Sequence, residues 1–355
     1  AAEGENAPIS WVHRSERFGE KLATPDTSIA DLIGEVDPIK VAEGRYLSDE
    51  LTLHYGLVPR TNRGIFAINE LPDLSERIQV GLLNVLEERD VQIRGYKIRL
   101  PLDVLLVASA NPEDYTNRGR IITPLKDRFG SQIRTHYPLE VETEIAIMRQ
   151  ESRAASIGDV KVTMPEFMER IIATFSHQAR SSSHVNQRSG VSVRLSVSNF
   201  EILSANAVRR ALRAGEREVA PRISDLDALA SSTGGKVEIE ALEEGRENGI
   251  LQQLISGAVL TVYKELAPGE MMREVLTAFE EGAVAHAGED ISSGELIALL
   301  TQIPSLMPPV KVLTGGDESP AMLASAVEFI LEGLHLTRRL NKDASGSKAT
   351  YRSRS

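Results

Sequence analysis

The segment from Gly64 to Pro138 alternates short apolar runs with polar residues, and this pattern constrains the fold more than any other feature of the 355-residue chain. The run from Ile65 to Ile68 is bounded by a glycine and by a polar pair, which is typical of a buried parallel strand. Val104 to Ala108 is a second such run, and Ile133 to His136 could be a third. Between the first two, apolar residues recur at helical spacing from Leu74 to Leu86. Strands that alternate with helices in this way predict an α/β domain with a largely parallel sheet.

Beyond Pro138 the pattern changes to successive helices, which places the expected domain boundary there. Helical spacing is clearest in residues 140–152, 165–179, 193–214, 250–266, 268–281 and 321–340. We expect an α/β core in residues 1–138, a helical domain in 139–220 and a further helical region in 221–340. The last residues, 341–355, carry four basic side chains and one acidic side chain among serine and glycine. They predict a disordered basic tail, with an electrostatic contact segment as the alternative.

The composition excludes several classes of function. The absence of cysteine rules out disulfides and thiolate chemistry, and the histidines do not fall at metal-ligand spacing. The net charge of −11 argues against nonspecific binding of nucleic acid, which relies on Lys and Arg neutralising phosphates. No uninterrupted apolar stretch is long enough to suggest a membrane span, so a cytoplasmic location is the default expectation. Because the first residue is Ala, a genuine amino terminus is not in view.

Asn69 and Glu70 stand at the end of the first apolar run, where a parallel strand would present them at the edge of its sheet. Hydrolysis of a nucleoside triphosphate needs a phosphate cradle, a divalent metal, an oriented water and a cation near the terminal phosphate. Glu70 is placed to orient that water. Asn69 offers an oxygen ligand without negative charge, which should weaken Mg²⁺ binding more surely than abolish it. The alternative is that Asn-Glu-Leu-Pro closes a strand and starts a turn.

Three further polar residues could complete such a site. Asn111 follows the second apolar run and precedes a proline, where its amide could bond the attacking water and a phosphate oxygen, or simply cap a turn. Arg128, held by the neighbouring Asp127, could present a rigid guanidinium fork to a phosphate, although a lone Arg is more often in a surface ion pair. Arg194, at the start of a predicted helix, has the same two interpretations.

The order and spacing of these residues resemble the AAA+ ATPases, most closely the MoxR-related branch that contains the ATPase subunit of magnesium chelatase. The resemblance covers about residues 20–265. It implies that Glu70 ends the Walker B strand, with Asn69 where a metal-facing Asp is expected, and that Asn111 is the first sensor. Arg128 would be the arginine finger that acts on a neighbouring subunit's nucleotide. Arg194 would be the second sensor, in a helical lid formed by residues 139–220.

The resemblance also implies cofactors and partners. Each interface of a homo-oligomeric ring would hold Mg²⁺ and ATP, and hydrolysis would remodel a partner that bears a von Willebrand A-type domain. Residues 91–99, which alternate apolar and polar side chains around Gly95, predict a two-stranded hairpin and match an insertion of this branch. Insertion of Mg²⁺ into a porphyrin is one use of such a subunit. Relatives act outside pigment synthesis, so the fold does not choose between these uses.

Two departures from the family pattern shape the expectation. The chain contains no Gly-x-x-x-x-Gly-Lys-Ser/Thr phosphate loop, and Asn69 replaces the usual Asp. Because the phosphate-loop strand is central in that sheet, its loss would leave neighbouring strands unpaired, so we expect a truncated AAA+ core whose first part lies outside this sequence. As it stands, the chain should not bind ATP tightly by itself. The alternative is a noncatalytic scaffold or regulatory subunit that stabilises an assembly without hydrolysing ATP.

Overall fold

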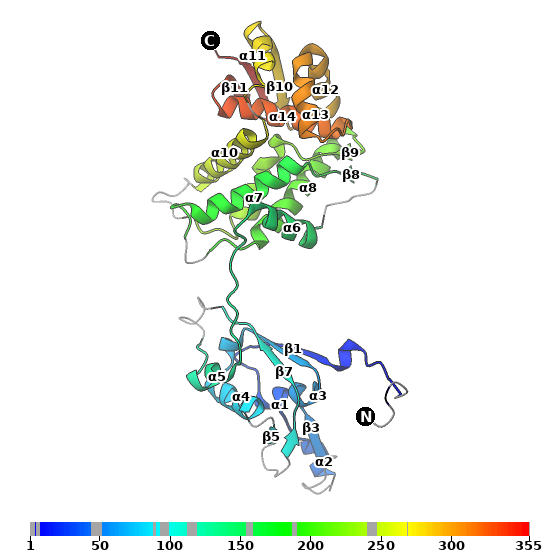
Figure 1. Ribbon diagram of the computed structural model, residues 1–355, viewed down its shortest axis with the longest axis vertical. Coiled ribbons are helices and arrows are strands. Elements are labelled where there is room, and N and C mark those ends of the chain that lie inside the picture. The colour runs from blue at the N-terminus through cyan, green and yellow to red at the C-terminus, as the bar shows by residue number, and fades with distance from the viewer. Residues whose placement is uncertain are drawn as a thin grey trace. The chain divides into compact units, whose positions relative to one another are not determined.

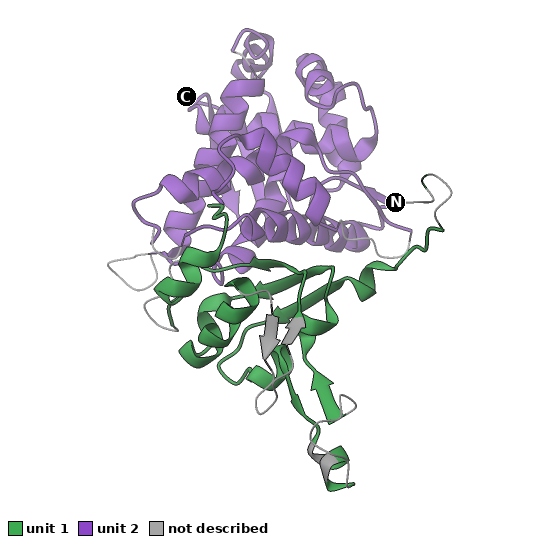
Figure 2. Cartoon of the chain, turned by 60° about the horizontal axis from the view of Figure 1, so that its bottom comes forward, with its two compact units in different colours: residues 1–134 green, residues 135–355 purple. Residues whose placement is uncertain are grey.

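The computed structural model describes residues 4, 8–43, 52–87, 90–92, 99–111, 119–153, 159–186, 190–239, 247–267 and 269–354. The chain folds into two compact units, Ala1–Arg134 and Thr135–Ser355, and each is described by itself. Figure 1 labels most of their helices and strands, and Figure 2 colours the first unit green and the second purple. The division lies near residue 138, where the change from strands to helices placed the expected boundary.

A three-stranded parallel sheet forms the centre of the first unit. Its strands are β1 (Phe18–Leu22), β4 (Ile65–Asn69) and β7 (Leu105–Ala108), in the order β1-β4-β7. The first residue of β4 is aligned with the first residue of β1 and with the first residue of β7. The two apolar runs predicted as parallel strands are therefore neighbours in one sheet, and the α/β fold class is confirmed.

The sheet buries one of its two faces. Phe66 and Ile68 of β4 belong to the same buried core as Leu82 of helix α4 (Glu76–Glu87). The opposite face is apolar but exposed, with the side chains of Phe18, Leu22, Ile65, Leu105 and Val107. In the described part of the chain, β4 is the strand that pairs with β7, which leaves the outer edge of β7 open. Because parallel sheets are ordinarily covered on both faces, this face is incompletely covered by the described residues.

Short elements complete the first unit. They are η2 (Arg14–Glu16), α1 (Ile29–Leu32), β2 (Gly34–Val36), α2 (Pro38–Ala42), β3 (Leu53–Tyr55), α3 (Leu57–Arg60), η4 (Leu71–Asp73), β5 (Asp90–Gln92), β6 (Arg99–Pro101) and α5 (Thr123–Arg128). The antiparallel pair β5 and β6 forms the hairpin predicted at residues 91–99, whose residues 93–98 lie outside the described residues. The strand suggested at Ile133–His136 is wrong, because no described residue pairs with it. Ile133 is 86% exposed, and an apolar run without a neighbouring strand cannot form a ladder.

The second unit is mainly helical around one large core. Its helices are α6 (Val141–Glu151), α7 (Glu166–Ser181), α8 (Arg194–Ala214), η6 (Ile223–Ala228), α9 (Leu229–Thr233), α10 (Glu247–Leu266), α11 (Arg273–Glu280), α12 (Ser293–Gln302), η7 (Pro304–Leu306), α13 (Met307–Leu313) and α14 (Pro320–Leu336). Helix ends follow local sequence: Ser292 and Glu295 form a capping box at α12, and Gly215 ends α8 with φ of 71°. No single described helix is long and apolar enough to cross a membrane. A bent pair, Ser293–Gln302 with Pro304–Leu313, meets that length and hydropathy with a bend of 110°.

The second unit also contains strands, which corrects two expectations. The expected disordered tail at residues 341–355 is corrected for residues 341–353, because β11 (Leu340–Ser345) and β12 (Lys348–Ser353) form a hairpin. β12 also pairs with β10 (Val284–Gly288), within a region expected to be wholly helical. Tyr351 is 3% exposed, so the hairpin is anchored in the core. Basic and small polar residues favour disorder only where no partner strand and core are at hand. A short parallel pair, β8 (Lys161–Val162) with β9 (Glu218–Val219), lies elsewhere in the unit.

Candidate functional site

Polar residues that follow β4 and β7 meet at the carboxyl edge of the parallel sheet. Asn69, the last residue of β4, accepts a hydrogen bond from Ser109 Oγ through its Oδ1 at 3.2 Å. Its Nδ2 donates to Glu20 Oε1 of β1 at 2.7 Å. The hydroxyl of Ser109 in turn accepts from the backbone N–H of Glu70 at 3.2 Å. The carboxyl ends of the parallel strands β4 and β7 lie at one edge of the sheet, and Glu20, in the middle of the neighbouring β1, reaches Asn69 there to complete one polar cluster.

Glu70 has the left-handed backbone conformation, with φ of 56° and ψ of 49°. A residue with a Cβ adopts this conformation at a cost of about 1–2 kcal/mol. Hydrogen bonds around it hold the turn: Asp73 N–H donates to the Glu70 carbonyl at 2.9 Å, and Leu71 N–H donates to the Ser109 carbonyl at 2.9 Å. In the part of the chain that the structure describes, no hydrogen bond or ion pair reaches the Glu70 carboxylate. Strained backbone that neighbours maintain is common at functional sites, so this geometry marks Glu70 as a candidate.

Asn111 is exposed and stands two residues after Ser109, on the segment that leaves β7. Ser109 is bonded to the turn at Glu70 on one side and, through its own N–H, to the Ile68 carbonyl at 2.9 Å. These bonds hold Ser109, two residues before Asn111, next to the turn at Glu70. The structure therefore places the predicted water-orienting carboxylate and the predicted first sensor at the same edge of the sheet.

Arg128 lies at the end of α5 and is bound within its own unit. Its Nε donates to Glu87 Oε2 at 2.7 Å, its Nη2 forms an ion pair with the same oxygen at 2.5 Å, and its Nη1 donates to the Pro124 carbonyl at 2.8 Å. Asp127 was expected to hold this guanidinium, and that expectation is wrong. Adjacent residues on a helix point in different directions, whereas Glu87 is presented by α4, which packs against α5. The Arg128 side chain keeps 30% of its surface exposed.

Arg194 is the first residue of α8, in the second unit, and it is exposed. Its backbone N–H donates to Ser192 Oγ at 3.2 Å. Three of the four predicted catalytic and sensing residues thus belong to the first unit, and Arg194 belongs to the second. The structure groups Glu70 with Asn111, and it places Arg128 on a separate pair of helices.

Sequence reasoning missed Glu20, and it did not assign Ser109 a role. Glu20 sits inside a five-residue strand with no motif around it, so only the pairing of β1 with β4 reveals it. With Asn69 these residues supply carboxylate, amide and hydroxyl oxygens, the donors that Mg²⁺ prefers. No group of three or more His, Asp or Glu in the described residues is arranged to hold a metal by itself. The edge therefore suits an Mg²⁺ ion that keeps waters and is shared with phosphates, and the chain has no phosphate loop to cradle those phosphates.

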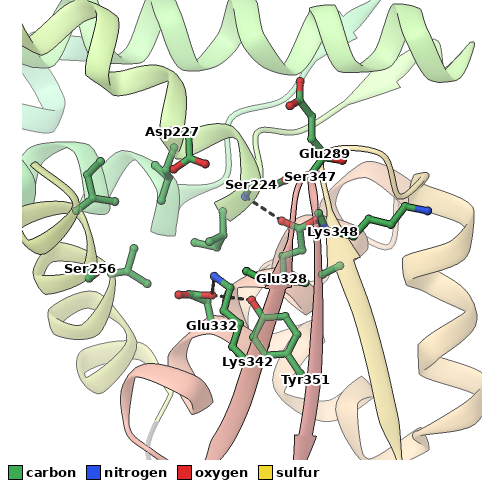
Figure 3. A pocket seen from close by; sticks show the side chains of 18 of the residues that line it. Ser224, Asp227, Ser256, Glu289, Glu328, Glu332, Lys342, Ser347, Lys348 and Tyr351 are labelled. Atoms are coloured by element: carbon green, nitrogen blue, oxygen red, sulfur yellow. Dashed lines mark hydrogen bonds and ion pairs between the residues drawn. The ribbon is translucent and has the colours of Figure 1, made fainter. Parts of the chain in front are cut away.

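The second unit contains a pocket of about 210 Å³ between η6, α10, α14 and the strands β10 to β12 (Figure 3). Two glutamates of α14 line it. Glu332 accepts from the Tyr351 hydroxyl at 2.6 Å and from Lys342 Nζ at 2.7 Å. Glu328 accepts from the Ser224 backbone N–H at 3.0 Å, and burial raises its pKa. Glu332 therefore links the C-terminal hairpin to α14, and Glu328 links η6 to α14.

Comparison with known proteins places these features in context. Residues 42–128 match the family model described as the Sigma-54 interaction domain. The chain is 31% identical over 160 residues to the magnesium-chelatase 38 kDa subunit of Cereibacter sphaeroides, covering 42% of this chain and 44% of that protein. It is 37% identical over 97 residues to the Rhodobacter capsulatus 38 kDa subunit, 27% of each chain. A crystal structure of NtrX from Brucella abortus in complex with ADP aligns over 82% of this chain and 58% of that chain, with TM-score 0.41 and 18% identity.

The matched region spans less than half the length of these curated magnesium-chelatase subunits. The family-model match at residues 42–128 contains Glu70, Asn111 and Arg128. Similarity in sequence and the parallel sheet of the first unit lead to the same conclusion. The resemblance of this chain to the AAA+ ATPases, and among them to the magnesium-chelatase subunits, is confirmed.

Proposed function

We propose that this chain forms part of an ATP-hydrolysing AAA+ subunit that assembles into a homo-oligomeric ring and remodels a partner protein. The observation that carries the proposal is the polar cluster at the carboxyl edge of the sheet, where Glu70 is held in a strained conformation beside Asn69. Glu70 would orient the attacking water, and Asn111 would contact the terminal phosphate. Similarity to magnesium-chelatase subunits supports this assignment.

Asn69 and Glu20 are the residues that would hold Mg²⁺ at this edge. The ion, when bound, supplies positive charge that offsets the developing negative charge on phosphate oxygens. Asn69 Oδ1 is an oxygen donor that already shares a hydrogen bond with Ser109, and Glu20 adds the negative charge that an amide lacks. The carboxylate of Glu20 therefore offsets part of what is lost when an Asp is replaced by Asn69.

The open face of the sheet supports a place for the phosphate loop. Asn69 and Glu20 lie on the same side of the sheet as exposed Ile65 and Val107, because alternate residues of paired strands share a face. The outer edge of β7 adjoins this face. A strand added along β7, followed by a helix over the face, would complete the cover that a parallel sheet requires. We propose that a phosphate-loop strand and helix, supplied by residues outside the given sequence, take this place.

Arg128 must exchange partners to act as an arginine finger. Its present partner, Glu87, has a side chain that is 57% exposed, and exposed ion pairs contribute about 0.2–1 kcal/mol. A phosphate presents more charge and more acceptor oxygens than one carboxylate. Arg128 would therefore lose little free energy when it leaves Glu87 to bind a neighbouring subunit's nucleotide. A ring, a partner with a von Willebrand A-type domain and a cytoplasmic location remain predictions that follow from this function.

The proposal is tested by ATP turnover of the gene product in its natural length, with Glu70→Gln as the first variant. We expect turnover to fall at least a hundredfold, since loss of a positioned general base costs about 10²–10⁴ in rate, while ATP binding persists. Glu76→Gln is the matched control, because Glu76 is an exposed carboxylate at the start of α4. Turnover that is unchanged by Glu70→Gln would exclude the catalytic role.

Arg128→Ala tests the action in trans. We expect turnover to fall while nucleotide binding remains within about threefold, since a finger contributes mainly to the transition state. Arg77→Ala, at an exposed position of α4, controls for loss of surface charge. Mixing Arg128→Ala subunits with Glu70→Gln subunits should restore turnover at mixed interfaces. Loss of binding alone in Arg128→Ala would count against a finger in trans.

A noncatalytic scaffold is the second candidate, and Asn69 favours it. Both ends of the Asn69 amide are already bonded within the unit, to Ser109 and to Glu20, as expected for a side chain with a structural role. A scaffold would form the ring and bind its partner with no ATP turnover, and Glu70→Gln would leave the assembly unchanged. Measured turnover that depends on Glu70 would exclude this alternative.

A further inference from the structure

One buried carboxylate ties the first turn of α8 to two other helices. Glu144 of α6 is 0% exposed and accepts from Arg180 Nη1 and Nη2 of α7, at 2.5 and 2.7 Å. It also accepts from Ser196 Oγ of α8 at 2.5 Å. His177 Nε2 lies 3.0 Å from the same carboxylate, in a direction that makes no hydrogen bond. A bidentate, buried pair of this kind fixes geometry strongly, because loss of either partner leaves a buried charge.

Arg180 also holds the segment that leads into α8. Its Nε donates to the Val191 carbonyl at 2.9 Å. Its guanidinium lies over the ring of Tyr137, 4.9 Å from the ring centroid. The Tyr137 hydroxyl packs so closely on Gly190, which has φ of 67°, that a Cβ at residue 190 would overlap it. Tyr137 belongs to the first residues of the second unit, directly after the division at residue 134. One guanidinium therefore contacts three parts of the second unit: residues 135–140, which precede α6 and are here called the linker, the approach to α8, and the buried carboxylate.

We propose that Arg180 is a positioning residue for Arg194 and that it couples the linker at Tyr137 to the start of α8. The inference rests on the proposed function together with the prediction that Arg194 is a second sensor, which would contact the bound nucleotide. Arg194 lies between two residues that this network holds, Val191 before it and Ser196 after it. Without the guanidinium, the Val191 carbonyl loses its partner and Glu144 is left buried without its cation. The backbone of the first turn is then free to move, and Arg194 moves with it.

Through this coupling, a movement of the linker would change the contact between Arg194 and the nucleotide. A movement of the chain at Tyr137 changes the surface on which the Arg180 guanidinium rests, and the same guanidinium bonds the residues before Arg194. A displacement of about 1 Å at a positioned group can cost as much as a hundredfold in rate. The position of Arg194 is therefore sensitive to where the linker lies.

The test uses the natural-length gene product and a fluorescent ATP analogue with Mg²⁺. We expect Arg180→Lys to weaken binding roughly tenfold, the equivalent of one hydrogen bond to a charged group. Combined with Arg194→Ala, it should weaken binding no further than Arg194→Ala alone, because both act through one contact. Arg210→Lys is the matched control. Arg210 forms a buried two-point pair with Asp225 in the same unit, so it should lose stability and keep nucleotide affinity.

Hydrogen exchange of residues 190–196 without nucleotide provides a readout that a general loss of stability would not reproduce. Arg180→Lys should raise exchange there, and Arg210→Lys should not. Tyr137→Leu, which leaves the carboxylate pair intact, should weaken nucleotide binding about two- to fivefold, as expected for one exposed cation–π contact. Unchanged exchange at residues 190–196 in Arg180→Lys, or additive effects with Arg194→Ala, would overturn the inference. If Arg180→Lys raises exchange at residues 190–196 but Arg194→Ala leaves nucleotide binding unchanged, Arg180 still positions the start of α8. That result would overturn the predicted contact between Arg194 and the nucleotide.

Discussion

Replacing Glu70 by glycine separates the strain at this residue from its chemistry. Glu70 has φ of 56°, a conformation that costs a residue with a Cβ about 1–2 kcal/mol and costs glycine little. Glycine also adds conformational freedom to the unfolded chain, and this lowers the free energy of unfolding by about 0.4–1 kcal/mol. Within the described residues, the substitution breaks no bond to the Glu70 carboxylate. We therefore expect Glu70→Gly to raise the free energy of unfolding of the first unit by about 0.5–1 kcal/mol.

The same substitution should abolish ATP turnover, because the water-orienting carboxylate is removed. Stability is measured by urea denaturation with hydrogen exchange of peptides that cover β4, since the two units need not unfold together. Glu70→Ala removes the carboxylate but keeps the Cβ, so it should bring no gain in stability. Arg63→Gly relieves a similar positive φ, 60°, at an exposed position before β4. It should stabilise the unit similarly and leave turnover unchanged.

Two results would refute this reasoning. If Glu70→Gly lowers the free energy of unfolding by more than about 1 kcal/mol, the left-handed conformation is not a source of strain. If Glu70→Gly retains turnover, the carboxylate is not needed for the reaction. A gain in stability together with loss of turnover would identify Glu70 as a residue whose conformation is maintained for function.

Three further substitutions test other parts of the structure. Asn69→Asp places a second carboxylate against Glu20, and the two negative charges repel each other. The melting temperature should therefore fall in EDTA and recover when Mg²⁺ is added. A melting temperature that is unchanged in both conditions would argue against a metal site. Burial raises the pKa of Glu328 above its ordinary 4.5. The protonated side chain therefore stabilises the fold fully below pH 4.5, and this stabilisation is lost as pH rises through the raised pKa. Glutamine cannot ionise, so in Glu328→Gln the free energy of unfolding should decline less steeply above pH 4.5. Urea denaturation at a series of pH values measures this decline. Gly333→Ala would drive a Cβ into the ring of Tyr263, with an expected cost of about 1–3 kcal/mol by chemical denaturation; no loss would show that the ring can move aside.

Local pattern determined much of the chain. Four apolar residues before Asn69 and five before Ser109 are short, continuous and bounded by polar residues, and they form adjacent parallel strands. Helical spacing likewise located α4, α7 and α8 within a few residues of their observed ends. These features depend on residues close together in the sequence, so the period of the side chains is sufficient to predict them.

Tertiary structure decided which residues pair. Arg128 binds Glu87, not its neighbour Asp127, because packing of α4 on α5 brings the distant carboxylate into reach. Residues 341–353 have a composition typical of a tail, but they form strands because β10 and the core beneath Tyr351 accept them. A strand is stable only with a hydrogen-bonded neighbour, and that neighbour is chosen by the whole fold.

The candidate site divides in the same way. The sequence alone shows Glu70 and Asn111 after apolar runs and Arg128 further along the chain, in an order that resembles the AAA+ ATPases. Only the tertiary structure placed Glu20 against Asn69 and forced Glu70 into a left-handed turn. The physical reason is that residue types and spacing are local properties, whereas contacts between strands and backbone strain arise when distant segments pack together.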